Sequence, residues 1–99
     1  MNIKERFLKY VSYDTQSSST SGTHPSTSKQ FELGKLLVEE LHAMGITNAY
    51  IDEYSYVYAF IPSNCNSNKT VGLIAHLDTA EDASGKDIKP RTIDFYTGQ

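Results

Sequence analysis

The order of apolar and polar residues predicts two helices in the first half of the chain. Within residues 2–13, apolar side chains recur every three or four positions, as they do on the buried face of a helix. Asn2 and Glu5 have the spacing of a capping box, in which each side chain accepts a hydrogen bond from the backbone of the other residue. We therefore expect the first helix to begin after Asn2 and to extend to about Tyr13.

A second and stronger helical pattern covers residues 27–44. Its apolar positions lie on one face at helical spacing, namely Phe31, Gly34, Leu37, Val38, Leu41 and Met44. Thr27 and Gln30 repeat the capping-box spacing, and Gly45 follows where a left-handed residue often ends a helix. The serine-rich segment 17–22 between the helices lacks apolar residues, so we expect it to be exposed.

Three further segments have the character of strands. Residues 49–52 and 56–61 are rich in aromatic and β-branched side chains, and residues 53–55 between them predict a hairpin or a bulged bend. Residues 71–75 form a continuous apolar run, which is typical of a strand buried on both faces of a sheet. The predicted order is helix, helix, strand, strand, strand, and the predicted fold class is α/β, with a mixed β-sheet between helices.

Two side chains that suit a metal site follow the apolar run. His76 and Asp78 are two residues apart, so a strand that continues to this point would place both on the same face. In open α/β sheets, ligands bind beyond the carboxyl ends of the strands. Imidazole nitrogen and carboxylate oxygen are both good zinc ligands, and a carboxylate can alternatively fix the tautomer of a ligating histidine.

The same pair also admits a purely structural interpretation. A histidine and an aspartate at the end of a strand can simply hydrogen-bond locally, since buried polar groups normally find partners. Of the other histidines, His24 lies in a polar loop and is expected to be solvated, the alternative being a role as a ligand or as a contact to substrate. His42 lies near a helix C-terminus, where the helix dipole favours a cation and a structural role suffices.

Composition narrows the classes of function. The 99 residues are enough for one small domain or part of a larger one, and the net charge of −3 provides no basic surface for nucleic acid. No apolar stretch has the length of a membrane span, and the charged N-terminus does not have the pattern of a signal peptide. The single Cys65 cannot form an internal disulfide, which favours a free thiol in a reducing cytoplasm.

Longer motifs around the candidate pair resemble a known family. Residues 72–79, Gly-Leu-Ile-Ala-His-Leu-Asp-Thr, have the strand end that is shared across the M20 family of zinc exopeptidases. Residues 82–91, Asp-Ala-Ser-Gly-Lys-Asp-Ile-Lys-Pro-Arg, narrow the resemblance to the tripeptide aminopeptidases of the peptidase T type. Residues 5–11 and 25–45 are also similar to the beginning of these enzymes, so the resemblance covers essentially the whole chain.

The resemblance implies that residues 1–99 are the N-terminal portion of a catalytic domain. It implies a cytoplasmic metalloprotease with two zinc ions in each active site, which releases the N-terminal residue of tripeptides. His76 matches the family's first zinc-ligating histidine, and Asp78 matches the aspartate that orients this histidine. The family's other metal ligands and its general base would lie beyond Gln99. Its dimerisation domain, which implies a homodimer, would also lie there.

A chain with only part of an active site is expected to be inactive alone. A catalytic zinc needs about three protein ligands and an open position for water, whereas the resemblance assigns one ligand to this chain. One alternative is another zinc exopeptidase or deacylase of the M20 family, which would share the same strand end. The other is a stand-alone remnant that folds and binds a partner without catalysis.

Overall fold

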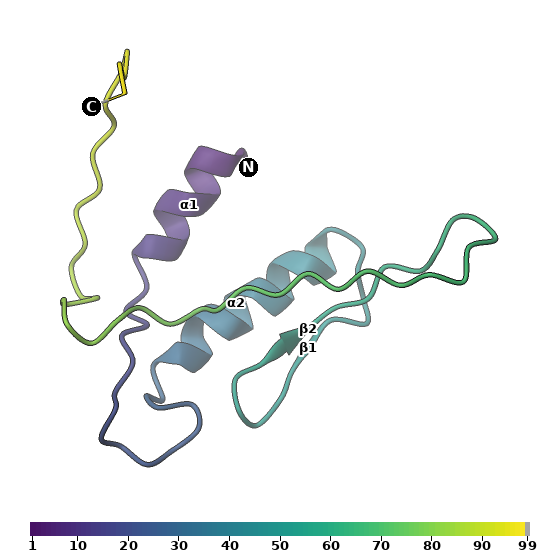
Figure 1. The fold of residues 1–99 in the computed structure, drawn as a ribbon, viewed down its shortest axis with the longest axis horizontal. Helices are drawn as coiled ribbons and strands as arrows, with labels where there is room; N and C mark the ends of the chain where they lie inside the picture. Colours follow the sequence, from purple (N-terminus) through teal and green to yellow (C-terminus); the bar gives the residue numbers. More distant parts are fainter. Residues whose placement is uncertain (99) are drawn as a thin grey trace.

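The computed structural model describes residues 1–98, which form two helices and one small antiparallel sheet (Figure 1). In chain order these elements are α1 (Ile3–Val11), α2 (Gln30–Ala43), β1 (Tyr50–Ile51) and β2 (Val57–Tyr58). The prediction of an α/β chain that begins with two helices and a hairpin is confirmed. Within the described range, no helix combines the length and the apolar character that crossing a bilayer requires.

α1 begins as its sequence predicts. The Asn2 side chain accepts a hydrogen bond from Glu5 N at 2.8 Å, and the Glu5 carboxylate accepts one from Asn2 N at 3.1 Å. The predicted capping box is therefore present, and it satisfies two backbone donors that have no partner within the helix. The helix ends at Val11, slightly earlier than predicted, and none of its residues is buried.

α2 begins at Gln30 without the predicted capping box. Lys29 occupies the N-cap position, and its side chain makes no capping hydrogen bond. The Thr27 hydroxyl instead donates to Gln16 O at 2.8 Å and accepts a hydrogen bond from Gln30 Nε2 at 3.0 Å. The capping-box prediction is wrong because this tertiary contact uses the hydroxyl. Gly45 adopts the expected left-handed conformation after the helix, with φ of 91°.

The predicted hairpin is present, with strands shorter than expected. The paired residues are Tyr50 with Tyr58 and Ile51 with Val57. At the turn, Asp52 Oδ1 accepts hydrogen bonds from Tyr54 N and Tyr56 N, each at 2.9 Å. Ser55 is left-handed, with φ of 66°, as is common at the end of a three-residue hairpin loop. The Asp52 side chain thus fixes the turn through the backbone.

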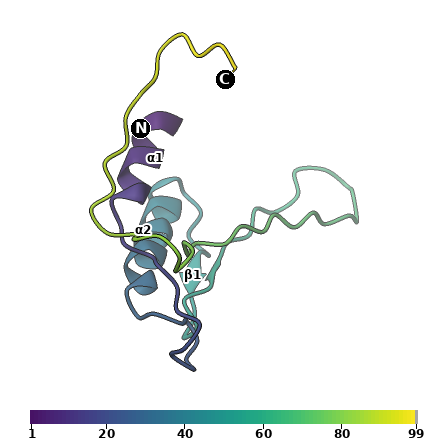
Figure 2. The same cartoon turned by 60° about the vertical axis from the view of Figure 1, so that its left-hand side comes forward.

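Residues 71–75 do not form the predicted buried strand. They follow a polar loop, 62–70, that projects away from the helices, and they return toward α2 as irregular chain (Figures 1 and 2). The side chains of Val71, Leu73 and Ile74 are 82%, 95% and 100% exposed. The prediction is wrong in this structure because a buried strand needs flanking strands and covering helices, and nothing within residues 1–98 pairs with this run.

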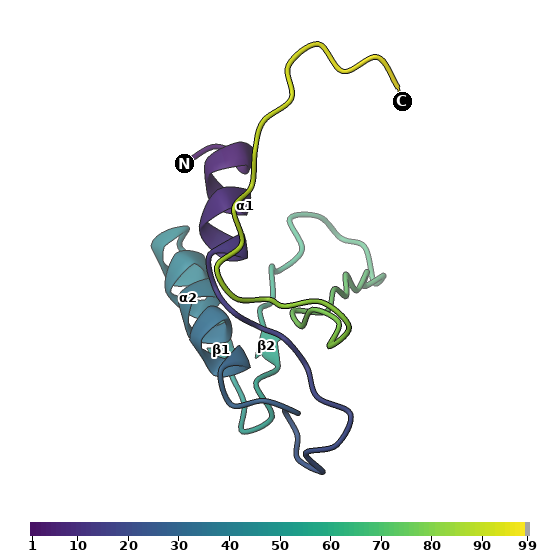
Figure 3. The same cartoon turned by 90° about the vertical axis from the view of Figure 1, so that its left-hand side faces the viewer.

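The small apolar core lies between α2 and the hairpin, which are neighbours in Figure 3. Leu33 on α2 and Ala49, just before β1, are 6% and 5% exposed. At Gly34 a Cβ atom would stand only 2.6 Å from Ile51 Cδ1, so the absence of a side chain permits this close approach. The core therefore fixes the hairpin against α2 and leaves α1 outside it.

A polar cluster joins α1 to α2. Glu40 on α2 accepts hydrogen bonds from Arg6 Nη1, at 2.7 Å, and from the Tyr10 hydroxyl. The other carboxylate oxygen of Glu40 is buried without a hydrogen-bond partner, and Lys9 Nζ lies 3.6 Å from it. The hydrogen bond from Tyr10 lowers the pKa of Glu40, and the charges of Arg6 and Lys9 add to this effect, although burial opposes it.

We predict that acid weakens the contact between α1 and α2. A carboxylate with a lowered folded-state pKa stabilises the fold above its unfolded pKa, and this stabilisation is lost as the pH falls through the folded value. Because the pKa of Glu40 is lowered from 4.5, the free energy of unfolding should decrease as the pH falls below this ordinary value and through the lower folded-state value. Denaturant titrations followed by circular dichroism at several pH values would measure this decrease.

Two substitutions on α2 isolate the contribution of Glu40. Glu40→Gln should lower the free energy of unfolding at neutral pH by about 1–3 kcal/mol, since the bonds from Arg6 and Tyr10 lose their ionised acceptor, and it should flatten the acid dependence. The exposed neighbour Glu39 provides the matched control, and Glu39→Gln should retain the full dependence. An acid profile that Glu40→Gln leaves unchanged would contradict this account.

Candidate functional site

The two candidate residues are in direct contact. His76 Nδ1 lies 3.0 Å from Asp78 Oδ1, so their side chains share one side of the chain although no strand forms. An ionised carboxylate can only accept a hydrogen bond, and therefore Nδ1 is the donor. The side chains of His76 and Asp78 are 84% and 40% exposed. The pair is thus formed at the surface.

The contact determines which nitrogen of His76 can bind a ligand. With the proton on Nδ1, a neutral imidazole has its lone pair on Nε2. Metal-ligating histidines usually donate their other ring N–H to a carboxylate or a carbonyl, which fixes the tautomer and the orientation of the ring. The His76–Asp78 pair has this arrangement.

The described residues do not assemble a complete metal site. Among residues 1–98, no three His, Cys, Asp or Glu side chains gather closely enough to hold an ion. His24 is exposed in the loop before α2, as its sequence predicts. His42 Nε2 contacts Ala49 O at 2.8 Å, which gives this histidine a structural partner beside β1.

The chain just beyond the candidate pair is fixed by backbone pairing with a distant segment. Thr79 N donates to Thr15 O at 3.1 Å, and Ser17 N donates to Thr79 O at 2.9 Å, which forms a parallel bridge opposite Gln16. Thr15 is 3% exposed. Because Ser17 and Thr79 are 62 residues apart, this bridge is a tertiary contact that brings the candidate pair to the segment after α1.

Side chains extend the pairing to Glu81. Its carboxylate accepts hydrogen bonds from Ser19 N at 2.8 Å and from Ser19 Oγ at 2.6 Å, and its backbone oxygen accepts one from Gln16 Nε2 at 2.9 Å. The two bonds from Ser19 lower the pKa of the Glu81 carboxyl because they favour its ionised form. We call the following residues the Thr79–Glu81 network: Thr15, Gln16, Ser17, Ser19, Thr79 and Glu81.

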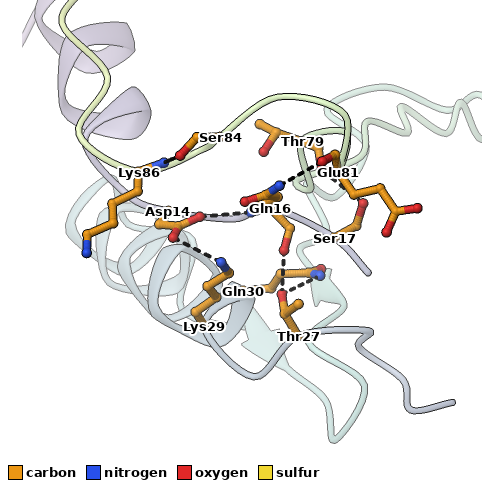
Figure 4. Close-up of polar contacts among 10 residues, drawn as sticks. All are labelled: Asp14, Gln16, Ser17, Thr27, Lys29, Gln30, Thr79, Glu81, Ser84 and Lys86. Atoms are coloured by element: carbon orange, nitrogen blue, oxygen red, sulfur yellow. Dashed lines mark hydrogen bonds and ion pairs between the residues drawn. The ribbon is translucent and has the colours of Figure 1, made fainter. Parts of the chain in front are cut away.

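The start of α2 supports the other side of this network (Figure 4). Asp14 forms an ion pair with Lys29 Nζ at 2.9 Å and accepts a hydrogen bond from Gln16 N at 3.2 Å. The bond from Lys29 is the main cause of a lowered pKa at Asp14. Thr27 donates to the backbone oxygen of the same Gln16. Residues 14–17 are therefore held between α2 and the segment that contains Thr79.

A hollow of about 760 Å³ opens beside the candidate pair. Its walls come from α2, from hairpin residues 54–58 and from residues 73–78, which include His76 and Asp78. The hairpin contributes three tyrosines to this wall. Leu41 on α2 and Met44, just after the end of α2, contribute apolar side chains. The imidazole and the carboxylate therefore border open space in which a ligand could lie.

The Thr79–Glu81 network has little signal in the sequence. The prediction that segment 17–22 is exposed is confirmed for residues 19–22, whereas Ser17 and Ser18 are half-buried. The available hint is a run of hydroxyl side chains together with a carboxylate, Glu81, shortly after the candidate pair. Helical and strand periodicity describe near neighbours, so they say nothing about partners 62 residues apart.

Curated proteins match the chain along almost its whole length, although no family model matches it. It is 54% identical over 101 residues to a peptidase T of Alkaliphilus oremlandii, an alignment that covers 99% of this chain and 25% of the relative. It is 47% identical over 98 residues to a peptidase T of Clostridium perfringens, covering 98% of this chain and 24% of the relative. It is 46% identical over 99 residues to a peptidase T of Parabacteroides distasonis, an alignment that covers 99% of this chain and 24% of the relative.

The extent of the match is the same in these three relatives. The chain spans about a quarter of the length of the curated relatives that it matches, and the matched part is N-terminal. The motifs at residues 72–79 and 82–91 lie within the aligned length. Over almost its whole length, the chain is therefore confirmed to resemble the N-terminal part of peptidase T.

Proposed function

We propose that the chain is the N-terminal portion of the catalytic domain of a zinc-dependent tripeptide aminopeptidase. The complete enzyme would release the N-terminal residue of tripeptides in the cytoplasm. The name that the matched relatives share, peptidase T, supports a peptidase. The observation that supports the residue roles is the contact between His76 and Asp78.

In this proposal His76 is a metal ligand and Asp78 is its positioning partner. The Asp78 carboxylate accepts a hydrogen bond from Nδ1–H, which keeps Nε2 available and raises its basicity. The negative charge of Asp78 also compensates part of the charge of a bound cation. A zinc ion bound at Nε2 supplies a Lewis acid that can polarise a substrate carbonyl.

The donor set fits zinc but provides one ligand of several. Histidine nitrogen is a common zinc ligand, and a catalytic site uses about three protein ligands. Since no such group of three occurs within residues 1–98, we propose that the other ligands and the general base come from beyond these residues. The chain alone should then bind zinc weakly and hydrolyse no peptide. The second zinc ion and the homodimer that the resemblance implies stay predictions.

Replacing Asp78 by Ala should change the tautomer of His76. Without an acceptor beside Nδ1, the ring proton is no longer held there, and ¹⁵N NMR of the imidazole should show loss of the Nδ1–H form. In the complete enzyme the zinc affinity should fall about 10–100-fold, as is usual when the partner of a ligating histidine is removed. Asp82→Ala, which removes a nearby exposed carboxylate, is the control and should change neither quantity. A wild-type tautomer in Asp78→Ala would disprove the role of this carboxylate.

The proposed reaction is tested with the complete protein that contains this chain. It should hydrolyse tripeptides from the N-terminus, lose activity with a chelator and regain it with zinc. His76→Ala should reduce activity to background, because a metal ligand is lost, whereas Glu53→Ala, in the exposed hairpin turn, should retain it. Hydrolysis that resists chelation, or that the purified 99-residue chain performs alone, would contradict the proposal. Hydrolysis of acylated amino acids, but not of tripeptides, would instead indicate a deacylase.

A further inference from the structure

The Thr79–Glu81 network begins one residue after Asp78. We propose that this network holds the His76–Asp78 pair in the arrangement that leaves Nε2 available, with Ser19 and Glu81 as positioning residues. The metal that this arrangement would serve rests on the proposed function, whereas the positioning itself does not. Ser19 and Glu81 act through the backbone, because the Glu81 carboxylate accepts its hydrogen bonds from Ser19 and has none with the imidazole.

The chain before the pair gives it little support. Leu73 and Ile74 are 95% and 100% exposed, and residues 70–78 contain no regular structure. The His76 side chain is itself 84% exposed. Side-chain packing therefore does not hold the imidazole in place, and the constraint on the pair must come from the residues that follow it.

The constraint after the pair acts on a specific peptide plane. The bond from Thr79 N to Thr15 O, at 3.1 Å, fixes the plane that links Thr79 to Asp78. The oxygen of Thr79 accepts hydrogen bonds from the backbone nitrogen and the hydroxyl of Ser17, both at 2.9 Å. Because both backbone groups of Thr79 are bonded, the direction in which the Asp78 side chain leaves the backbone is restricted.

Glu81 secures the same segment two residues later. Its two carboxylate oxygens each accept one hydrogen bond from Ser19, and such bonds to an ionised group are stronger than bonds between neutral groups. Ser19 lies two residues after Ser17, and Glu81 lies two residues after Thr79. Residues 15–19 and 79–81 are therefore joined at two places, Ser17 with Thr79 and Ser19 with Glu81. The carboxylate therefore resists sliding of residues 79–81 along residues 15–19.

Close packing at Gly85 shows that the segment has little freedom. A Cβ atom at this position would lie 2.9 Å from Asp14 Oδ1 and 3.0 Å from Thr79 Oγ1. Asp14 Oδ1 accepts the hydrogen bond from Gln16 N, so a side chain at residue 85 must move this carboxylate or turn the Thr79 hydroxyl aside. At Gly72, in contrast, an added Cβ atom would have no neighbouring atom within 4 Å.

The test uses the ¹⁵N-labelled chain and the ring nitrogens of His76, recorded by NMR at neutral pH. Glu81→Ala should lose the Nδ1–H signature of His76, because Ser19 no longer holds the segment. Glu81→Gln should retain most of it, since the amide oxygen can still accept one of the two bonds. The exposed Glu53 in the hairpin turn provides the matched control, and Glu53→Ala should leave the signature unchanged.

A second pair of variants tests the packing of Gly85 against Asp14 and Thr79. Gly85→Ala should weaken the signature, because its Cβ crowds Asp14 Oδ1 and Thr79 Oγ1, whereas Gly72→Ala should keep it. The helical circular dichroism of α2 shows whether each variant is folded. If both Glu81→Ala and Gly85→Ala lose this helical signal, the test uses Ser19→Ala, which removes the hydroxyl donor to Glu81 and keeps the backbone donor. A reduced Nδ1–H signature in this variant supports the inference, and an unchanged one overturns it.

The result that overturns the inference is a His76 signature that survives in folded Glu81→Ala and Gly85→Ala. Equal loss in Gly72→Ala or Glu53→Ala would overturn it as well, because the effect would then not depend on the network. Neither zinc nor catalysis enters this measurement. Failure of the proposed function would appear separately, as absence of zinc-dependent hydrolysis in a complete protein whose His76 signature is intact.

Discussion

The parallel bridge between Thr79 and residues 15–17 is the contact on which the arrangement of this chain depends. It joins the segment after α1 to a segment 62 residues later, and it buries Thr15 to 3% exposure. Among residues 1–98 the buried apolar side chains are Leu33 and Ala49, so hydrophobic burial fixes little beyond α2 and the hairpin. The position of the second half of the chain, including the candidate pair, therefore depends on hydrogen bonds.

The same dependence on polar contacts extends to the N-terminal helix. α1 has no buried residue and is joined to α2 through the charged Glu40 cluster, while residues 87–98 extend past it as irregular chain (Figures 1 and 3). Hydrogen bonds to ionised groups contribute about 1.5–3 kcal/mol each, and this contribution depends on ionisation. A structure held in this way responds to pH and to single polar substitutions more than one held by a large core.

Local patterns predict the helices and the hairpin because their causes are local. The capping box at Asn2, the left-handed Gly45 and the turn before Val57 each depend on residues a few positions apart. The buried strand at 71–75 is not observed, because burial is a property of neighbours that these residues cannot supply. Thr27 bonds to Gln16 instead of capping α2 for a similar reason. For the site, the sequence predicts that His76 and Asp78 lie on the same side of the chain. It does not predict that residues 15–17 pair with the backbone of Thr79 next to them.

The resemblance to peptidase T and the geometry of the pair converge on one account of the site. In the proposed site, the Nδ1–H of His76 donates to the Asp78 carboxylate, which leaves Nε2 available for a metal, and the bridge at Thr79 lies one residue after this pair. The most direct test is amide hydrogen exchange, residue by residue. The account predicts that Ser17 and Thr79 are protected while Leu73 and Ile74 exchange freely, and that Glu81→Ala removes this protection. Exchange at Thr79 as fast as at Leu73 would show that the bridge is not formed, and would contradict the account.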